Sequence, residues 1–228
     1  QLDRIEEFAP EVAVILNVTP DHIGYHGSME NYFLTKLKIS SRQSPKNFLI
    51  LNADDEQLSR GDINVKARIM QFSMSPVARG IFSDGGRIKI KFSEQHLEEE
   101  LMRIDELSLP GVHNLYNSMA AAIASRVFEI RNEDIRDSLM SFSGVEHRLE
   151  KVRTVEVDYI NDSKATNINA AWYALRSYDR PIVWIAGGRG DNNDYSQLDE
   201  SVRENVKTII SLGEERDAIF NHFSSMKR

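Results

Sequence analysis

The sequence predicts an α/β fold organised as two domains, and three observations support this prediction. In the last third of the chain, short β-branched segments alternate with helical segments, which is typical of βαβ units and a mostly parallel sheet. In the first part, apolar segments end in polar turns, and such turns follow the strands of α/β folds at the edge that binds ligands. The length of 228 residues also favours two domains over one.

The first domain is expected to cover residues 1–143. Its predicted elements, in order, are a strand at 13–18, a helix at 28–41, a strand at 48–52, short strands over 67–92 and a helix at 114–128. Ser28 is a suitable N-cap for the first helix because its hydroxyl can accept a bond from a free backbone amide. Asp84-Gly85-Gly86 is typical of a hairpin turn. The alanines of the second helix permit close packing against a sheet.

The second domain is expected to cover residues 144–228, after a loop-like stretch at 142–150. Its predicted elements, in order, are a strand at 155–160, a helix at 169–177, a strand at 182–186, a helix at 197–205, a strand at 208–212 and a helix at 214–223. Because parallel strands need crossover connections of this length, the alternation indicates a parallel sheet with a Rossmann-like arrangement.

Composition restricts the partners. Lys and Arg number 28 against 35 Asp and Glu, which gives a net charge of −7 and disfavours binding to nucleic acid or an anionic membrane. There is no cysteine, so a disulfide framework and a thiolate metal site are excluded. The longest apolar runs are far shorter than the ~20 residues of a membrane-spanning helix. We therefore expect a cytoplasmic protein that acts on small molecules as a monomer.

Five polar strings are candidate functional segments: 17–22 with the helix lysine Lys36, 110–117, 144–150, 159–167 and 187–195. Taken alone, each has an ordinary structural explanation, respectively a satisfied turn, a capped helix start, a charged linker, a strand-to-helix turn and a glycine turn. Their polar groups could also bind a ligand. Asparagine amides offer both a donor and an acceptor, and an arginine fork or a lysine suits phosphate and carboxylate groups.

Together these strings resemble the Mur ligases, a family of ATP-dependent amino-acid ligases of peptidoglycan synthesis, over essentially the whole chain. GVEHRLE at 144–150 is similar to the family's element at the junction of two domains. YINDSKATN at 159–167 is similar to the strand-end turn of the D-glutamate-adding members. The resemblance implies a partial Mur-ligase central domain at 1–143, which binds ATP, followed by the first part of a Rossmann-like C-terminal domain at 144–228.

The resemblance also implies the roles of the site residues. His22 and Lys36 are expected to hold Mg²⁺, Lys36 after carbamylation, because a carbamate supplies the hard oxygen ligands that this ion prefers. A catalytic role is implied for His22, Lys36 and Lys164. The expected nucleotide-binding residues are Asn114, Asn117, Arg148 and Asp162, with Asn117 at the adenine. Lys164 and Thr166 are expected to face the incoming amino acid and the acyl phosphate.

The chain departs from the family pattern at two places. Gly24 and Tyr25 stand where the family usually has Asp and Arg, and Asp191 stands where it has a lysine for the D-glutamate side chain. Because a carboxylate would repel that substrate group, we expect Asp191 to weaken its recognition unless Arg189 supplies the charge. The chain begins with Gln1 and contains no G-x-x-x-x-G-K-[ST] phosphate loop. We interpret it as a fragment that has no ligase activity alone.

The implied function of the parent enzyme is to join D-glutamate to UDP-N-acetylmuramoyl-L-alanine through an acyl phosphate, with ATP and Mg²⁺ as cofactors. Such a step belongs to cell-wall biogenesis and thereby to cell shape and division. Two other interpretations stay open. A non-catalytic nucleotide-binding remnant is favoured by Asp191, Gly24 and the missing phosphate loop. A ligase like folylpolyglutamate synthase shares the architecture, but the string at 159–167 disfavours it.

Overall fold

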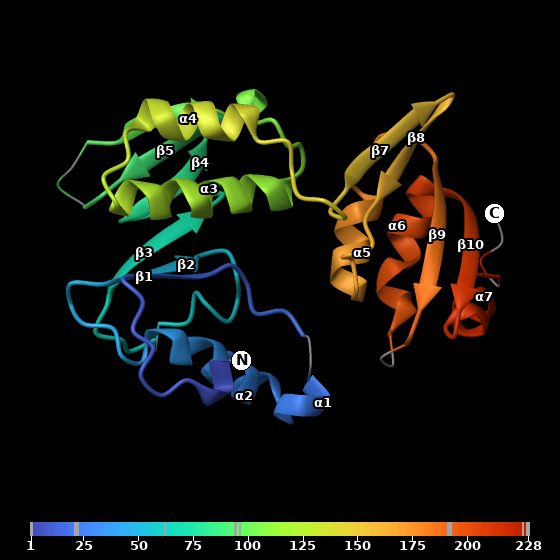
Figure 1. Cartoon of the computed structure of the whole chain (residues 1–228), viewed down its shortest axis with the longest axis horizontal. Helices are drawn as coiled ribbons and strands as arrows, with labels where there is room; N and C mark the ends of the chain where they lie inside the picture. Colours follow the sequence, from blue (N-terminus) through green and yellow to red (C-terminus); the bar gives the residue numbers. More distant parts are fainter. Residues whose placement is uncertain are drawn as a thin grey trace. The chain divides into compact units, whose positions relative to one another are not determined.

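The computed structural model describes residues 2–20, 23–61, 63–93, 95, 97–190, 193–224 and 226 (Figure 1). The chain divides into two compact units, residues 1–143 and 144–228. Two clusters of buried apolar side chains lie in the first unit and one in the second, so each unit has its own core.

Unit 1 is built on a six-stranded sheet whose strands follow their order along the chain. They are β1 (Val12–Ile15), β2 (Phe48–Asn52), β3 (Arg68–Ser73), β4 (Gly80–Asp84), β5 (Arg87–Lys91) and β6 (Glu99–Arg103). Neighbours from β1 to β4 pair in parallel, whereas β4–β5 and β5–β6 are antiparallel. The carboxyl ends of β1 to β4 therefore share one edge, where α/β folds bind ligands.

Helices cover both faces of this sheet. They are α1 (Ile23–His26), α2 (Met29–Leu37), α3 (Val112–Val127) and α4 (Asn132–Ser141), with short 3-10 turns at Leu2–Arg4, Lys38–Ser40 and Ile104–Glu106. Leu49 and Leu51 of β2 pack in the cluster that includes Phe33 of α2, and Ile50 between them packs in the cluster of α3. Because successive strand residues point to opposite faces, β2 is buried on both sides.

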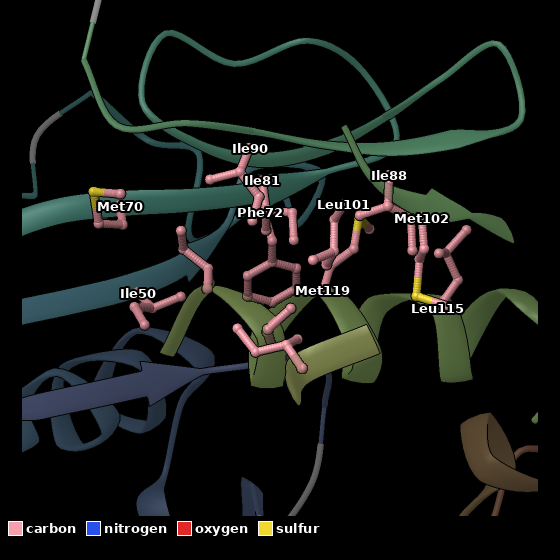
Figure 2. Close-up of a cluster of buried hydrophobic side chains, with 14 residues drawn as sticks. Ile50, Met70, Phe72, Ile81, Ile88, Ile90, Leu101, Met102, Leu115 and Met119 are labelled. Carbon is pink, nitrogen blue, oxygen red and sulfur yellow. The ribbon is translucent and has the colours of Figure 1, made fainter. Parts of the chain in front are cut away.

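The larger core lies between the sheet and α3 (Figure 2). Phe72 of β3 and Ile81 of β4 are fully buried there, as is Met119 of α3. Ile135 of α4 joins the same cluster. This core fixes α3 against the sheet, and the N-terminal end of α3 carries two of the expected nucleotide-binding residues.

The start of α2 agrees with the prediction from sequence. Ser28 has extended backbone angles (φ −157°, ψ 160°), and its hydroxyl accepts a hydrogen bond of 3.1 Å from the backbone amide of Asn31. This bond satisfies one of the helix's free amides and so fixes the first residue of the helix. The helix ends at Leu37 instead of residue 41, because the following residues form the 3-10 turn Lys38–Ser40.

Unit 2 combines a parallel strand pair with a separate hairpin. Its elements are β7 (Glu150–Val155), β8 (Val157–Asn161), α5 (Ile168–Leu175), β9 (Ile182–Gly188), a 3-10 turn at Tyr195–Leu198, α6 (Asp199–Asn205), β10 (Val206–Gly213) and α7 (Arg216–Ser224). β9 and β10 pair in parallel, and β7 and β8 pair antiparallel. Apolar side chains of α5, α6 and α7 form the core with Trp184 of β9.

The α/β fold class is confirmed, but α1, β6, α4 and the β7–β8 hairpin were not predicted. β6 and α4 contain many charged residues, and only Leu101, Met102 and Ile135 of these two elements are buried. A single strand was expected at 155–160, whereas the chain turns at Glu156 (φ 57°) and forms the β7–β8 hairpin. No helix in the described part of the chain combines the length and the apolar composition needed to cross a membrane.

Gly80 at the start of β4 is expected to tolerate no side chain. A Cβ atom at this position would lie 1.8 Å from the carbonyl oxygen of Gln71 on the paired strand, with φ at +148°. Because backbone cannot move away as a side-chain end can, we expect Gly80→Ala to lower the free energy of unfolding by about 2–3 kcal/mol. Urea unfolding would measure this. Gly61→Ala, which meets nothing within 4 Å, is the control. Equal stability of the two variants would contradict the prediction.

Candidate active site

The first part of the candidate site lies where β1 leaves the sheet of unit 1. The ammonium group of Lys36, on the last turn of α2, donates a hydrogen bond of 2.8 Å to the carbonyl oxygen of Asn17. The same ammonium lies 4.7 Å from the centre of the Tyr32 ring, one turn earlier on the helix. Lys36 is half-buried and directed at the β1 exit, so it is not an ordinary solvated surface lysine.

The expected Mg²⁺ ligands are only partly described. His22 and its neighbour Asp21 lie outside the described residues. Among the residues that the structure describes, no group of three or more His, Asp or Glu side chains could hold a metal ion. The carbonyl of Asn17 is a hard oxygen donor beside Lys36, and a carbamate on Lys36 would add two more. The described residues therefore fit Mg²⁺ only if Lys36 is carbamylated.

The second part of the site is the start of α3. The helix begins at Val112 with Gly111 at its N-cap (φ 99°), so Asn114 lies in the first turn of the helix and does not cap it. The amide of Asn114 instead donates to the carbonyl of Pro110 at 2.8 Å. Asn117 is exposed, and its side chain makes no hydrogen bond with any residue in the described part of the chain. Asn117 is thus the better candidate for pairing with a base.

A turn that sequence reasoning missed lies between these two parts. It comprises Asn52, the last residue of β2, and the three residues that follow it, and is named here the 52–55 turn. Asp55 accepts a hydrogen bond of 2.8 Å from the backbone amide of Val18, and Asp54 accepts one of the same length from the hydroxyl of Tyr116. The signal was present in the sequence, because an amide and two carboxylates stand at the end of an apolar strand.

In unit 2, the strings 144–150 and 159–167 are held together by hydrogen bonds. The carboxylate of Asp162 accepts a bond of 3.1 Å from the backbone amide of Leu149. The backbone amide of Lys164 donates to the carbonyl of His147 at 3.1 Å. Burial raises the pKa of Tyr178, and the nearby charge of Asp162 raises it further. The backbone of Arg148 therefore lies between two residues that are both bonded to the string 159–167.

The backbone on both sides of Arg148 is strained. His147 (φ 66°) and Leu149 (φ 46°) adopt left-handed conformations, which cost about 1–3 kcal/mol for residues other than glycine. Glu150 holds this turn by accepting a bond of 2.8 Å from the amide of His147, and the amide of Asn161 bonds to the His147 ring at 2.8 Å. Sequence reasoning missed Asn161 and Glu150 as residues that set the position of Arg148.

The remaining residues of the second string divide by exposure. Asn167 caps α5, accepting a bond of 2.8 Å from the amide of Ala170. Lys164 and Thr166 are exposed, and neither side chain bonds to a residue that the structure describes. They are free to meet a ligand, as their expected roles require. Each unit carries its own candidate residues, Lys36 and Asn117 in unit 1, and Arg148, Asp162, Lys164 and Thr166 in unit 2.

Comparison with known proteins assigns the chain to a family. Residues 1–125 match the family model of the Mur ligase middle domain. The chain belongs to the Mur ligase family. The curated relatives of this Mur ligase chain include a protein of Salinibacter ruber, 44% identical over 96% of this chain and 49% of the relative, and one of Pelotomaculum thermopropionicum, 41% identical over 94% and 47%. Both are named UDP-N-acetylmuramoylalanine–D-glutamate ligase. The chain spans about half the length of these relatives.

Solved Mur ligase structures share the fold of this chain. MurF from Acinetobacter baumannii matches 96% of this chain and 54% of its own with a TM-score of 0.67 and 18% identity. MurC from Thermotoga maritima matches 97% and 50% with a TM-score of 0.65 and 18% identity. At such low identity these matches support the α/β architecture of the Mur ligase chain but not a substrate.

The glycine-rich string at 187–195 differs most from the expected Mur ligase pattern. Asp191 lies outside the described residues. Arg189 is highly exposed, and its guanidinium lies 3.5 Å from the carboxylate of Glu214. Tyr195 donates a hydrogen bond of 2.6 Å to Glu215, and burial followed by this bond raises the pKa of Tyr195 to about 12. Arg189 thus already has one carboxylate partner in the protein, although the exposed pair is weak and leaves other guanidinium donors available.

Proposed function

We propose that this chain forms part of an ATP-dependent ligase that adds D-glutamate to UDP-N-acetylmuramoyl-L-alanine. The observation that carries the proposal is the 41–44% identity, over 94–96% of the chain, to relatives named for that activity. The string at 159–167 supports it, since Asn161 and Asp162 are engaged in holding Arg148 while Lys164 and Thr166 are exposed. The proposed setting is peptidoglycan synthesis in the cytoplasm, with the protein acting as a monomer.

The proposed reaction has two steps. The terminal carboxylate of UDP-N-acetylmuramoyl-L-alanine attacks the γ-phosphorus of ATP, which releases ADP and forms an acyl phosphate. The amine of D-glutamate then attacks the acyl carbon, phosphate leaves, and the amine nitrogen loses a proton to give the amide. Mg²⁺, held by His22 and carbamylated Lys36, would neutralise the phosphate oxygens.

The described side chains suit these steps. The Asn117 amide offers both a donor and an acceptor to the adenine edge. Arg148 offers a planar fork to phosphate oxygens, and Asp162 holds the backbone that presents it. Lys164 and Thr166 offer an ammonium and a hydroxyl to the acyl phosphate and to the amino-acid carboxylate, where negative charge develops. Asn114, which is bonded to Pro110, contributes to the nucleotide site by shaping the start of α3.

The decisive experiment measures phosphate release by the gene product that contains this chain, with ATP, Mg²⁺ and UDP-N-acetylmuramoyl-L-alanine present. We expect release that depends on D-glutamate and not on L-glutamate. Release with a folate and L-glutamate in its place would support a ligase like folylpolyglutamate synthase. No release with any amino acid would support a nucleotide-binding remnant, the interpretation that Asp191 in place of the family lysine favours. The 228-residue chain alone, which contains no phosphate loop, is expected to release none.

A further inference from the structure

We propose that the 52–55 turn is a positioning element that holds the Lys36 end and the Asn117 end of the site in register. This inference rests on the proposed function, because it assigns a role relative to the nucleotide. β2 lies between β1 and β3, and all three run parallel. The turn therefore leaves the sheet between the exits of its two neighbours, and its side chains can reach both.

On one side, the turn fixes the backbone that follows β1. The amide of Asn52 donates to the carbonyl of Leu16 at 3.1 Å, and Asp55 accepts from the amide of Val18 at 2.8 Å. Between them, the carbonyl of Asn17 accepts from Lys36. Three consecutive residues of this loop are thus each bonded to a side chain. Asp55 also accepts from the backbone amides of residues 57 and 58, which fixes its own orientation.

On the other side, Asp54 fixes the exit of β3 and the start of α3. One carboxylate oxygen accepts from the hydroxyl of Ser73 at 2.6 Å. The other accepts from the backbone amide of Met74 at 2.6 Å and from the hydroxyl of Tyr116 at 2.8 Å. Tyr116 directly precedes Asn117, so this bond limits how far the adenine-binding candidate can move from the sheet.

The three donors to Asp54 and the three to Asp55 explain why two adjacent carboxylates occur in this turn. Hydrogen bonds to ionised acceptors are about twice as strong as neutral ones. Misplacing a binding group by about 1 Å can reduce a reaction rate about 100-fold, so such fixing is useful at a site and unnecessary in an ordinary surface turn.

Tyr116→Phe in the gene product tests the Asn117 side, because it removes only the hydroxyl bonded to Asp54. We expect the KM for ATP to rise about tenfold while kcat stays within about threefold, since the nucleotide binds less well but reacts normally once bound. The KM for D-glutamate should not change. Asp84→Asn, which removes an exposed ion pair to Lys89 on the β4–β5 hairpin, should leave all constants unchanged. An unchanged KM for ATP in active Tyr116→Phe enzyme would overturn the inference.

Asp55→Asn tests the Lys36 side. Its bond to the Val18 amide loses the charge of the acceptor, so we expect kcat to fall about tenfold with the KM for ATP within about twofold. Equal changes in both constants for both variants would indicate a general loss of structure and would count against two separate positioning roles.

Hydrogen exchange on the 228-residue chain gives a second measurement that needs no activity. Tyr116→Phe should speed hydrogen exchange of the backbone amides at 115–118 about tenfold. Asp55→Asn should speed exchange of the Val18 amide by a similar factor. The exchange rates of the β5 amides should be unchanged in both variants. If the wild-type gene product releases no phosphate, the proposed function fails while exchange still decides whether the turn holds these segments. If exchange is unchanged at both places, the positioning role is wrong whatever the activity.

Discussion

Arg148→Ala in the gene product that contains this chain is expected to lower kcat/KM for ATP by about 100- to 1,000-fold. Arg148 is exposed and makes no ion pair with any residue that the structure describes, so its charge is available to a phosphate. Its backbone is held by bonds at His147 and Leu149. Because the backbone that carries Arg148 is held, we expect no neighbouring side chain to take the place of the lost guanidinium.

Two further variants make this prediction specific. Arg148→Lys keeps the charge but loses the planar fork, and it should recover only part of the activity. Arg180→Ala removes another highly exposed arginine of the same unit, whose guanidinium lies 3.6 Å from Asp158, and it should have no effect. The melting temperature should be the same for all three proteins. Arg148→Ala enzyme with more than about a third of wild-type kcat/KM would exclude the assigned role.

Phe72→Ala is expected to lower the free energy of unfolding of unit 1 by about 3–5 kcal/mol. Phe72 is fully buried between the sheet and α3 (Figure 2). The Tyr116 ring lies 6.1 Å away in an edge-on contact. Alanine would leave a cavity that the rigid sheet cannot close. For a unit of this size, the loss corresponds to a melting temperature lower by roughly 10 °C.

Phe128→Ala is the matched control, because it removes the same side chain from an exposed position at the end of α3. We expect its effect to stay below about 0.5 kcal/mol. Calorimetry of the chain would compare the two variants. If the two units unfold separately, only the transition of unit 1 should move in Phe72→Ala. Similar stability of both variants would mean that the packing around Phe72 contributes little.

The sequence predicted the elements in which the pattern of apolar and polar residues marks the buried positions. Residues 48–52 form an apolar run and become β2, buried on both faces, and Ser28 caps α2 as expected. α4 was missed because its only buried residue is Ile135, so no apolar periodicity marks it. The β7–β8 hairpin was missed because its turn is Glu156 in a left-handed conformation, without the glycine or asparagine that usually marks such a turn.

The sequence predicted the candidate site as separate strings of residues. It could not predict the hydrogen bonds between those strings. Arg148 and Asp162 were each chosen from their own string, but the bond from Leu149 to Asp162 depends on the pairing of β7 with β8. The 52–55 turn was missed for a related reason. Its carboxylates bond to Val18 and Tyr116, which are 37 and 62 residues away from their partners along the chain. Contacts between residues so far apart in the chain depend on the order of the strands in the sheet, and this order cannot be predicted from a single sequence.

The left-handed backbone conformation at His147 and Leu149 limits which amino-acid substitutions these two positions tolerate. In a complete substitution scan, glycine, asparagine and aspartate should be tolerated best at both, since these residues enter left-handed conformations at low cost. Proline should be the least tolerated, because its φ is fixed at about −65° and it has no amide hydrogen to donate. Valine, isoleucine and threonine should come next, although they match leucine in polarity or size better than glycine does. Selection at these two sites would therefore follow torsion angles and not hydrophobicity, and substitution scores based on chemical similarity would rank the variants in the wrong order.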